Sequence, residues 1–166
     1  MNDFVLIGKI VNTFGIKGEL KLKSDFNYIE KVLVNGFKLY IGPSYELAIF
    51  NSFRIHKGYY MIKLNGYDNI NDVLKYKGLN VFVKKEDLNL KSDEYLFSDL
   101  IGYEVYDNDL FIGIVKDYII NNVTYLKVTL NKKDFFIPMV QEYIKKIDKE
   151  EKRITTNKGS ELILWK

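Results

Sequence analysis

The chain has 166 residues and a formal net charge of +3 at pH 7; 47% of its residues are hydrophobic, and it contains 13 Tyr, 11 Phe and no Cys. The absence of cysteine excludes a disulfide framework, a thiolate nucleophile and a cysteine-built zinc site. No apolar run approaches the roughly 18 residues that a membrane helix needs. Asp3 precedes the short apolar segment Phe4–Ile7, where a signal peptide would be basic. These features predict a cytoplasmic protein with no membrane segment, long enough for one ordinary domain or two small ones.

Positive charge is concentrated in the first half of the chain. Residues 1–88 contain 13 Lys or Arg against 9 Asp or Glu, whereas residues 89–166 contain 12 against 13. A basic half favours an anionic partner, and RNA above all. The same counts also fit ordinary solvated lysines, so charge alone leaves the partner open.

The first predicted element is a β-hairpin around Gly15–Gly18. An apolar strand leads into this turn, and the strand that leaves it alternates Leu20 and Leu22 with Lys21 and Lys23. The two glycines permit positive φ values in the turn, and period-two alternation places the leucines on one face and the lysines on the other. The pattern predicts the rim of a β-barrel that presents a lysine-bearing loop beside a basic strip.

The remainder of the first half predicts further strands connected by turns, and one short helix. These elements are a hairpin over residues 31–40 around Asn35-Gly36, strands over 47–55, 59–64 and 79–83, and about two helical turns over 70–76 with Asn69 or Asn71 as N-cap. Gly78 is expected to end the helix.

A charged segment over residues 84–93 holds the predicted boundary between two domains, 1–87 and 94–166, with 88–93 as the linker. The second half predicts short strands over 103–106, 111–120, 123–130, 135–137, 153–156 and 162–165. Pro138 is expected to end one of these strands and to open a short helix through Tyr143, because it has no N–H for the sheet. Short strands at this spacing predict an all-β protein made of two small β-barrels with one or two short helices.

Residues suited to catalysis are sparse. His56 is the single histidine, and no recognisable serine elbow accompanies it. Glu94 and Asp99 could act as an acid–base pair, although carboxylates at such positions more often cap turns. The Gly15–Gly18 turn is too short for a Walker loop and precedes a strand, not a helix. The sequence therefore predicts a protein that is not an enzyme and that holds no metal and no cofactor.

One group of residues suited to binding consists of cations that could converge on the first barrel. They are Lys17, Lys21, Lys23, Arg54 and Lys57. If all of them met phosphates of single-stranded RNA, the logarithm of the binding constant would fall with the logarithm of the salt concentration at a slope of roughly −3.5, or about −0.7 per contact. We call this quantity the salt slope. Such contacts would give modest affinity without sequence readout, so a protein contact would have to supply the rest.

A second group, Tyr95, Leu96 and Phe97, follows the predicted linker. Two interpretations of these apolar side chains are open. They pack in a core or between the two barrels, or they anchor a protein partner near the domain junction.

Several segments match, in order, those of a known family. They are Gly8–Val11 with Gly15–Glu19, Arg54–Gly58, Leu79–Leu88, Glu94-Tyr95 with Asp99–Gly102, Gly113-x-Val115, and Phe136–Pro138 with Lys146–Asp148. Each motif is weak alone, but six in this order on both sides of a linker are specific. On these residues the chain resembles the bacterial RimM family of ribosome maturation factors over essentially its whole length.

The resemblance implies a translation-factor-like β-barrel in the N-terminal half and a PRC barrel in the C-terminal half. It implies a non-enzymatic assembly factor that binds the small ribosomal subunit precursor, through small-subunit ribosomal protein nineteen and rRNA. Such a factor helps the 3′ (head) domain of that rRNA to mature. By position, the family's shared N-domain loops fall on Gly15, Lys17, Gly18, Arg54, His56 and Lys57. The first member of the family's aromatic pair falls on Tyr95.

Two positions depart from the family pattern. Phe14 stands where the family usually has histidine before the turn, and Leu96 stands where it has a second aromatic residue. Phe14 makes a polar role at that loop position unexpected, whereas the neighbouring Phe97 could take the place of the missing ring.

Two other functions remain open from the sequence. A general RNA- or tRNA-binding β-barrel of the translation machinery would show RNA affinity without any ribosomal protein. A PRC-barrel enzyme or membrane-complex accessory would need a convergent polar pocket or a hydrophobic anchor, and the sequence offers neither. The expected oligomeric state is a monomer.

Overall fold

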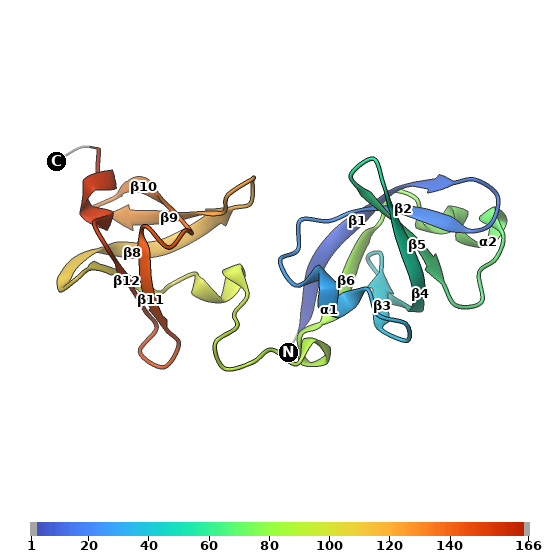
Figure 1. Cartoon of the computed structure of the whole chain (residues 1–166), viewed down its shortest axis with the longest axis horizontal. Helices are drawn as coiled ribbons and strands as arrows, with labels where there is room; N and C mark the ends of the chain where they lie inside the picture. Colours follow the sequence, from blue (N-terminus) through green and yellow to red (C-terminus); the bar gives the residue numbers. More distant parts are fainter. Residues whose placement is uncertain (1–2, 165–166) are drawn as a thin grey trace. The chain divides into compact units, whose positions relative to one another are not determined.

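The computed structural model describes residues 3–164 (Figure 1). The chain divides into two compact units, residues 1–90 (unit 1) and residues 91–166 (unit 2), and this division falls inside the segment predicted as a linker. Each unit is built on its own β-sheet, so the prediction of an all-β protein with few short helices is confirmed. Among the described residues, no helix is long and apolar enough to cross a membrane.

Unit 1 is a closed barrel of six antiparallel strands. They are β1 (Phe4–Phe14), β2 (Glu19–Lys23), β3 (Lys38–Ile41), β4 (Glu46–His56), β5 (Tyr59–Leu64) and β6 (Asn80–Lys84). Around the barrel they follow the order β1, β2, β5, β4, β3, β6, and β6 pairs with β1 to close it. Closure removes exposed strand edges. As the alternation of β2 predicts, Leu20 and Leu22 are fully buried in the barrel.

Short helices fill the connections of unit 1. α1 (Ile29–Val32) lies between β2 and β3, α2 (Ile70–Val73) continues as the 3₁₀ helix η1 (Leu74–Tyr76), and the 3₁₀ helix η2 (Lys85–Leu88) follows β6. Asn69 is the N-cap of α2, because its side-chain oxygen accepts a hydrogen bond from the backbone N–H of Asn71 at 2.9 Å. The helix predicted over 70–76 is therefore confirmed, with Asn69 as its cap.

The hairpin predicted over residues 31–40 is wrong in its first half, because residues 31 and 32 belong to α1 and residues 33–36 form the turn after it. Ile29, Val32 and Leu33 have the i, i+3, i+4 spacing of a helix, and Val32 and Leu33 are buried. The Asn35-Gly36 turn, with Gly36 at a φ of +93°, connects α1 to β3. The hairpin partner of β3 is β4.

Unit 2 is a six-stranded sheet flanked by two 3₁₀ helices. Its elements are η3 (Phe97–Leu100), β7 (Glu104–Asp107), β8 (Leu110–Ile119), β9 (Tyr125–Leu130), β10 (Lys133–Pro138), β11 (Ile144–Asp148), β12 (Arg153–Thr156) and η4 (Gly159–Leu162). The strand order is β10, β9, β8, β7, β12, β11, and the β7–β12 pair is parallel whereas the others are antiparallel. In the described residues the ladder of hydrogen bonds ends at β10 and β11.

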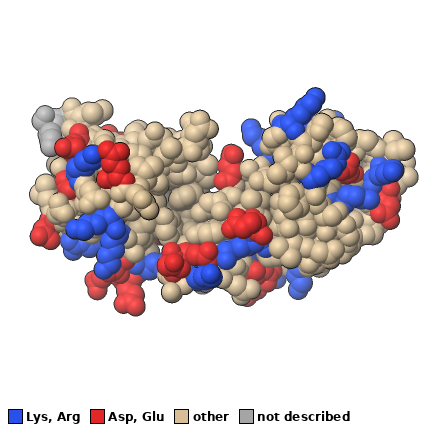
Figure 2. Space-filling view, in the orientation of Figure 1, with Lys and Arg blue, Asp and Glu red and all other residues tan. Residues whose placement is uncertain are grey.

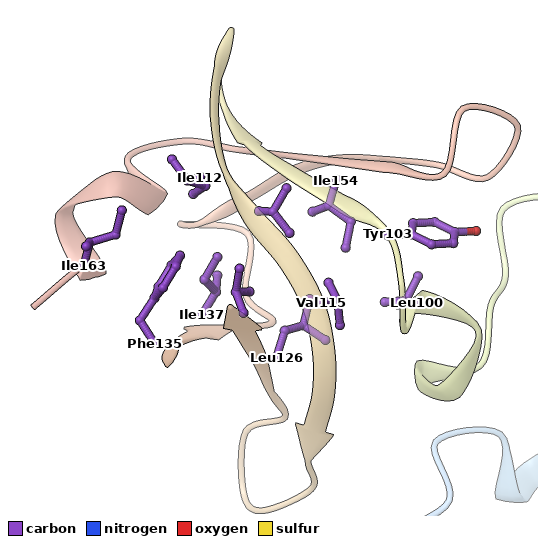
Figure 3. Packing of buried hydrophobic residues seen from close by; sticks show 11 residues of the cluster. Leu100, Tyr103, Ile112, Val115, Leu126, Phe135, Ile137, Ile154 and Ile163 are labelled. Carbon is purple, nitrogen blue, oxygen red and sulfur yellow. The ribbon is translucent and has the colours of Figure 1, made fainter. Parts of the chain in front are cut away.

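The core of unit 2 is a cluster of buried apolar side chains to which most of its elements contribute (Figure 3). Its members are Leu100, Tyr103, Val105, Ile112, Val115, Leu126, Val128, Phe135, Ile137, Ile154 and Ile163. Strands β8 and β9 approach closely over this core, since a Cβ atom at Gly113 would lie 2.6 Å from the backbone oxygen of Thr129. Glycine is therefore required at position 113.

Two predictions for unit 2 are wrong. Pro138 ends β10, but the turn after it leads into β11 and not into a helix. A bulge between Ile144 and Lys146 breaks the period-two alternation that would have marked β11 as a strand. The strand predicted over residues 162–165 is also wrong, because η4 occupies its first position and Ile163 packs in the core; Trp165 lies outside the described residues.

Candidate nucleic-acid interface

The predicted turn between β1 and β2 has the backbone that its glycines suggest. Gly15 and Gly18 have φ values of +66° and +88°. A Cβ atom at Gly18 would lie 2.5 Å from the backbone oxygen of Tyr67, and the backbone N–H of Ile70 donates to the oxygen of Ile16 at 3.0 Å. The turn is therefore held against the start of α2, while the side chain of Ile16 is exposed.

Beyond this turn, residues of β2, β5 and β4 lie side by side on the outside of the barrel. In the register of these strands, Met61 of β5 lies directly opposite Lys21 of β2 and opposite Arg54 of β4. Directly opposite residues project from the same face of a sheet. Lys21 and Arg54 reach solvent, so Met61 also points outward, yet it is only 1% exposed. Neighbouring side chains therefore cover Met61 on this outer face.

Arg54 is oriented on this face by two hydrogen bonds to Glu19. Its Nε and Nη2 atoms donate to the two carboxylate oxygens of Glu19 at 2.9 and 3.0 Å. These hydrogen bonds hold the pKa of the Glu19 carboxyl below its ordinary value of 4.5 and raise that of Arg54. The guanidinium carbon lies 5.4 Å from the centre of the Phe14 ring, which is itself 5.5 Å from the ring of His56. The arrangement presents an oriented cation beside two rings.

A second cation on the same face is placed in a similar way. The Nζ atom of Lys21 lies 4.2 Å from the centre of the Tyr59 ring, within the range of a cation–π contact. We call these side chains together the outer-face cluster. Its members are Phe14, Glu19, Lys21, Arg54, His56, Tyr59 and Met61.

The other predicted cations of unit 1 are exposed and lie at the margins of this face. Lys17 is in the β1–β2 turn, Lys57 is in the β4–β5 turn with a φ of +50°, and Lys23 ends β2 opposite Lys9 of β1. On the faces seen in Figure 2, basic and acidic side chains lie in small mixed groups. The structure thus brings Lys21, Arg54 and His56 into one cluster, with the other lysines around it.

The aromatic segment at the start of unit 2 is largely covered. Tyr95 packs against the core cluster, and its ring lies 6.1 Å from that of Phe97, which lies 5.9 Å from Tyr118. Leu96 is only 4% exposed, whereas Tyr95 and Phe97 are half-buried. Any contact from this segment to a partner would therefore come from the two rings.

The two carboxylates considered for acid–base chemistry cap local turns. Glu94 accepts a hydrogen bond from the backbone N–H of Lys91 at 2.8 Å, and Asp99 accepts one from the N–H of Leu96 at 3.2 Å. Their geometry matches the structural interpretation of these residues. Within residues 3–164, no group of three or more His, Asp or Glu side chains is placed to hold a metal ion.

A polar groove of about 460 Å³ lies on unit 2 between the β7–β8 turn and strands β11 and β12. It is lined by Asn108, Asp109, Lys145, Lys146, Asp148, Glu151, Arg153 and Thr155. Three cations and three carboxylates balance each other there, so the groove has no preference for a ligand of one charge. The guanidinium carbon of Arg153 stacks 3.6 Å from the centre of the Tyr106 ring.

Sequence reasoning missed four members of the outer-face cluster as site residues. Glu19 precedes Lys21 by two positions, so period-two alternation could have placed both on one face. Tyr59 and Met61 could be assigned only from the pairing of β5 with β2 and β4. Phe14 differs in the sequence only as a departure from the family pattern, which gives no sign of a contact with Arg54.

Both units match known families of protein domains. A family model described as the RimM N-terminal domain matches residues 5–88, and one described as the PRC-barrel domain matches residues 92–163. The two matches therefore lie on either side of the division between unit 1 and unit 2.

The chain is also similar to complete proteins. It is 38% identical over 162 residues to the ribosome maturation factor RimM of Staphylococcus haemolyticus, and the aligned region covers 93% of this chain and 97% of that relative. It is 35% identical over 158 residues to the ribosome maturation factor RimM of Exiguobacterium sibiricum, with 92% and 93% covered. A crystal structure of a protein assigned as the 16S ribosomal RNA processing protein RimM of Pseudomonas aeruginosa is 21% identical, covers 96% of this chain and 99% of that chain, and has a TM-score of 0.48.

Proposed function

The chain belongs to the RimM family, and from this membership we propose that it is a non-enzymatic factor in the maturation of the small ribosomal subunit. The observation that carries the proposal is the match of both units, in order, to proteins named ribosome maturation factor RimM over nearly their whole length. A general RNA-binding barrel would need only the first unit. The presence of the second unit therefore favours a factor with more than one partner.

Its partners in the proposal are small-subunit ribosomal protein nineteen and the 3′ (head) domain of the small-subunit rRNA. The excess of positive charge in residues 1–88 favours unit 1 as the rRNA contact. The nearly neutral second half, with the paired rings of Tyr95 and Phe97 at its start, favours unit 2 as the contact with the ribosomal protein. Lys17, Lys21, Lys23, Arg54, His56 and Lys57 are the proposed contacts of unit 1.

The proposed mechanism is differential affinity. The factor binds an immature conformation of the subunit more tightly than the finished one, and so shifts the population toward conformations that can mature. This mechanism requires two binding surfaces and no covalent step. The factor acts as a monomer in the cytoplasm, where ribosomes are assembled.

Sucrose-gradient sedimentation of a tagged copy from its own cells tests the function. We expect the protein to migrate with small-subunit precursors and to be absent from translating ribosomes. Absence from every ribosomal fraction at low salt would contradict the proposal and would favour free RNA, as for a general RNA- or tRNA-binding barrel, or an unrelated protein partner.

The contact with the ribosomal protein is tested by changing the two rings. Tyr95→Ala combined with Phe97→Ala should weaken the binding of small-subunit ribosomal protein nineteen in a calorimetric titration, because ring contacts supply much of the energy of such interfaces. Because Tyr95 packs against the core, thermal unfolding must establish that unit 2 remains folded, and the milder Phe97→Leu provides a second variant. The matched control is Phe111→Ala with Tyr125→Ala, which removes two exposed rings of β8 and β9. Equal affinity in the wild type and the Tyr95/Phe97 variants would refute this assignment.

A further inference from the structure

Side chains of the outer-face cluster contact one another, which a diffuse basic strip does not require. Glu19 holds Arg54 by two hydrogen bonds, and Lys21 lies over the ring of Tyr59. Solvated lysine and arginine side chains normally keep their rotamer freedom, and fixing it costs free energy. Cations oriented by their neighbours are therefore suited to contacts in which the direction of the N–H donors matters.

We infer that this cluster is an oriented RNA contact in which Lys21 and Arg54 bind phosphates and Phe14 stacks on an unpaired base. Glu19 is the positioning residue, because it acts through Arg54. The inference rests on the proposed function, which supplies rRNA as the anionic partner. It goes further by assigning separate roles to the residues and by including an acidic residue in an RNA contact.

The hydrogen bonds of Arg54 leave part of its guanidinium available. A guanidinium carries five N–H donors in one plane, and Glu19 uses one on Nε and one on Nη2. The remaining donors lie in the same plane, where a phosphate can accept two of them side by side. Glu19 therefore turns a flexible cation into a preoriented phosphate site.

Lys21 and Arg54 are spaced for different phosphates of one strand. They belong to β2 and β4, with β5 between them, so two interstrand spacings of roughly 5 Å separate their backbones. That distance is about three times the rise of about 3.4 Å per nucleotide of a stacked strand. A short stretch of single-stranded RNA could contact both cations at once.

Phe14 adds a contact that salt does not screen. Its ring is 39% exposed beside Arg54 and His56. Stacking of a base on an aromatic side chain tolerates any sequence, because every base has a π-face. A ring at this position suits an unpaired nucleotide whose phosphates lie on the neighbouring cations.

The substitution Glu19→Gln distinguishes a positioned cation from a diffuse basic strip, because the two interpretations predict opposite changes in RNA affinity. Removing a negative charge strengthens RNA binding if only net charge matters. If Glu19 positions Arg54, the same change weakens binding by about threefold, since the fork of charge-assisted hydrogen bonds is lost. The matched control is Glu46→Gln, which breaks the ion pair of Glu46 with Lys75 (2.8 Å) elsewhere on unit 1 and makes the same change of charge.

The measurement is fluorescence anisotropy of the full-length chain with a labelled transcript of the 3′ domain of small-subunit rRNA, and with oligouridine as an unstructured probe. We expect Glu19→Gln to bind more weakly than Glu46→Gln. Arg54→Lys, which keeps the charge and loses the fork, should weaken binding with little change in salt slope. Glu19→Gln binding as tightly as Glu46→Gln, or more tightly, would overturn the inference.

Two further variants separate the contribution of the ring from that of charge. Phe14→Leu should weaken binding roughly fivefold at constant salt slope, whereas Lys21→Gln should lower the slope by about 0.7. Phe53→Leu is the control for the ring, because Phe53 is also exposed but shares the face of the buried Ile62. Equal losses in the Phe14 and Phe53 variants would exclude stacking on Phe14.

The outcomes also distinguish this inference from the proposed function. If the wild type migrates with small-subunit precursors and the outer-face variants bind RNA like their controls, the function stands and the inference fails. If the variants behave as expected but the protein is absent from precursors, the RNA contact stands and the function fails. A wild type that binds neither RNA probe at low salt would overturn the inference. Loss of ribosomal-protein binding in the outer-face variants alone would also overturn it and would assign the cluster to a protein partner.

Discussion

At the scale of single residues, Asp107 joins distant parts of unit 2. It ends β7, and its carboxylate accepts hydrogen bonds from the backbone N–H groups of Lys158 and Ser160 at 2.9 and 3.1 Å. The hydroxyl of Ser160 donates to the same carboxylate. Thr156 supports this connection by donating from its hydroxyl to the backbone oxygen of Tyr106 at 3.0 Å. The segment after β12 is therefore held to β7 by side-chain hydrogen bonds.

Asp107→Ala should destabilise unit 2 by about 2 kcal/mol, because two backbone N–H groups lose a charged acceptor. Chemical denaturation followed by a probe in unit 2 measures the change. Asp109→Ala is the control: this neighbouring carboxylate is exposed, and its removal should change stability by no more than about 0.5 kcal/mol. Similar stability of the two variants would show that the hydrogen bonds of Asp107 contribute little.

The ion pair of Glu19 and Arg54 makes the stability of unit 1 depend on pH in a defined direction. The pKa of Glu19 is lower in the folded protein than its ordinary value of 4.5, chiefly because of the hydrogen bonds from Arg54. A group of this kind stabilises the folded state above its unfolded pKa, and the contribution is lost as the pH falls through the folded pKa. Both side chains are partly exposed to solvent, so water screens the pair and its contribution to the free energy of unfolding is small.

Glu19→Gln should therefore lower the free energy of unfolding near neutral pH, and its difference from the wild type should shrink as the pH falls below 4.5. Urea denaturation of both proteins over a series of pH values measures the effect. A difference that stays constant down to acidic pH would mean that the charge of Glu19 does not stabilise the barrel. Glu30→Gln, at an exposed position of α1, serves as the control.

At the scale of elements, the β1–β2 turn contains two glycines with different structural roles. Both have positive φ, but nothing lies within 4 Å of a Cβ atom built on Gly15, whereas one on Gly18 meets the backbone of Tyr67 at 2.5 Å. Gly15 is required only for its backbone conformation. Gly18 also allows the turn to approach the segment that precedes α2.

Gly15→Ala should cost about 1–2 kcal/mol, the usual price of a left-handed conformation for an alanine. Gly18→Ala should cost more, because the backbone must also move away from Tyr67. Thermal unfolding of the two variants provides the comparison. If both lose the same stability, the close approach at Gly18 is relieved without cost.

The elements that could be predicted from the sequence are those specified by local chemistry. The Gly15–Gly18 hairpin and the helix capped by Asn69 follow from turn and cap residues a few positions apart. Strand β11 could not be predicted, since its bulge places Ile144 and Ile147 three residues apart. The pairing of Glu19 with Arg54 joins residues 35 positions apart, and it depends on the register of β2, β5 and β4, which no local pattern specifies.

At the scale of the whole molecule, each unit has its own β-sheet, and unit 2 has a contiguous core drawn from its own elements. Barrel closure completes unit 1 through the pairing of β1 with β6. The fraction of unfolded surface that a domain buries rises with its size, from about 60% at about 60 residues to about 70% at about 150 residues, so small domains are marginally stable. We therefore expect a small free energy of unfolding for each unit, although neither sheet takes a strand from the other.

Residues 1–90 and 91–166, expressed as separate fragments, should each fold. Amide hydrogen exchange provides the measurement: the strands of each fragment should show protection that follows the same pattern as in the full chain. A fragment without protected amides would mean that its unit depends on the other. Asp107→Ala in the 91–166 fragment should reduce protection there and provides an internal control.

The parallel pairing of β7 with β12 has a consequence for how the chain is completed during its own synthesis. β6, which closes the first barrel, ends at Lys84, whereas β12, which pairs with the first strand of unit 2, ends at Thr156. At about 5–20 residues per second, the roughly 70 residues between these points take about 4–14 seconds to translate. During that interval the nascent chain can carry a finished barrel, and β7 can pair with β8, but the other neighbour of β7, β12, has not yet been made. A protein proposed to help ribosomes mature would thus itself depend on a ribosome finishing most of its second half before that half can fold.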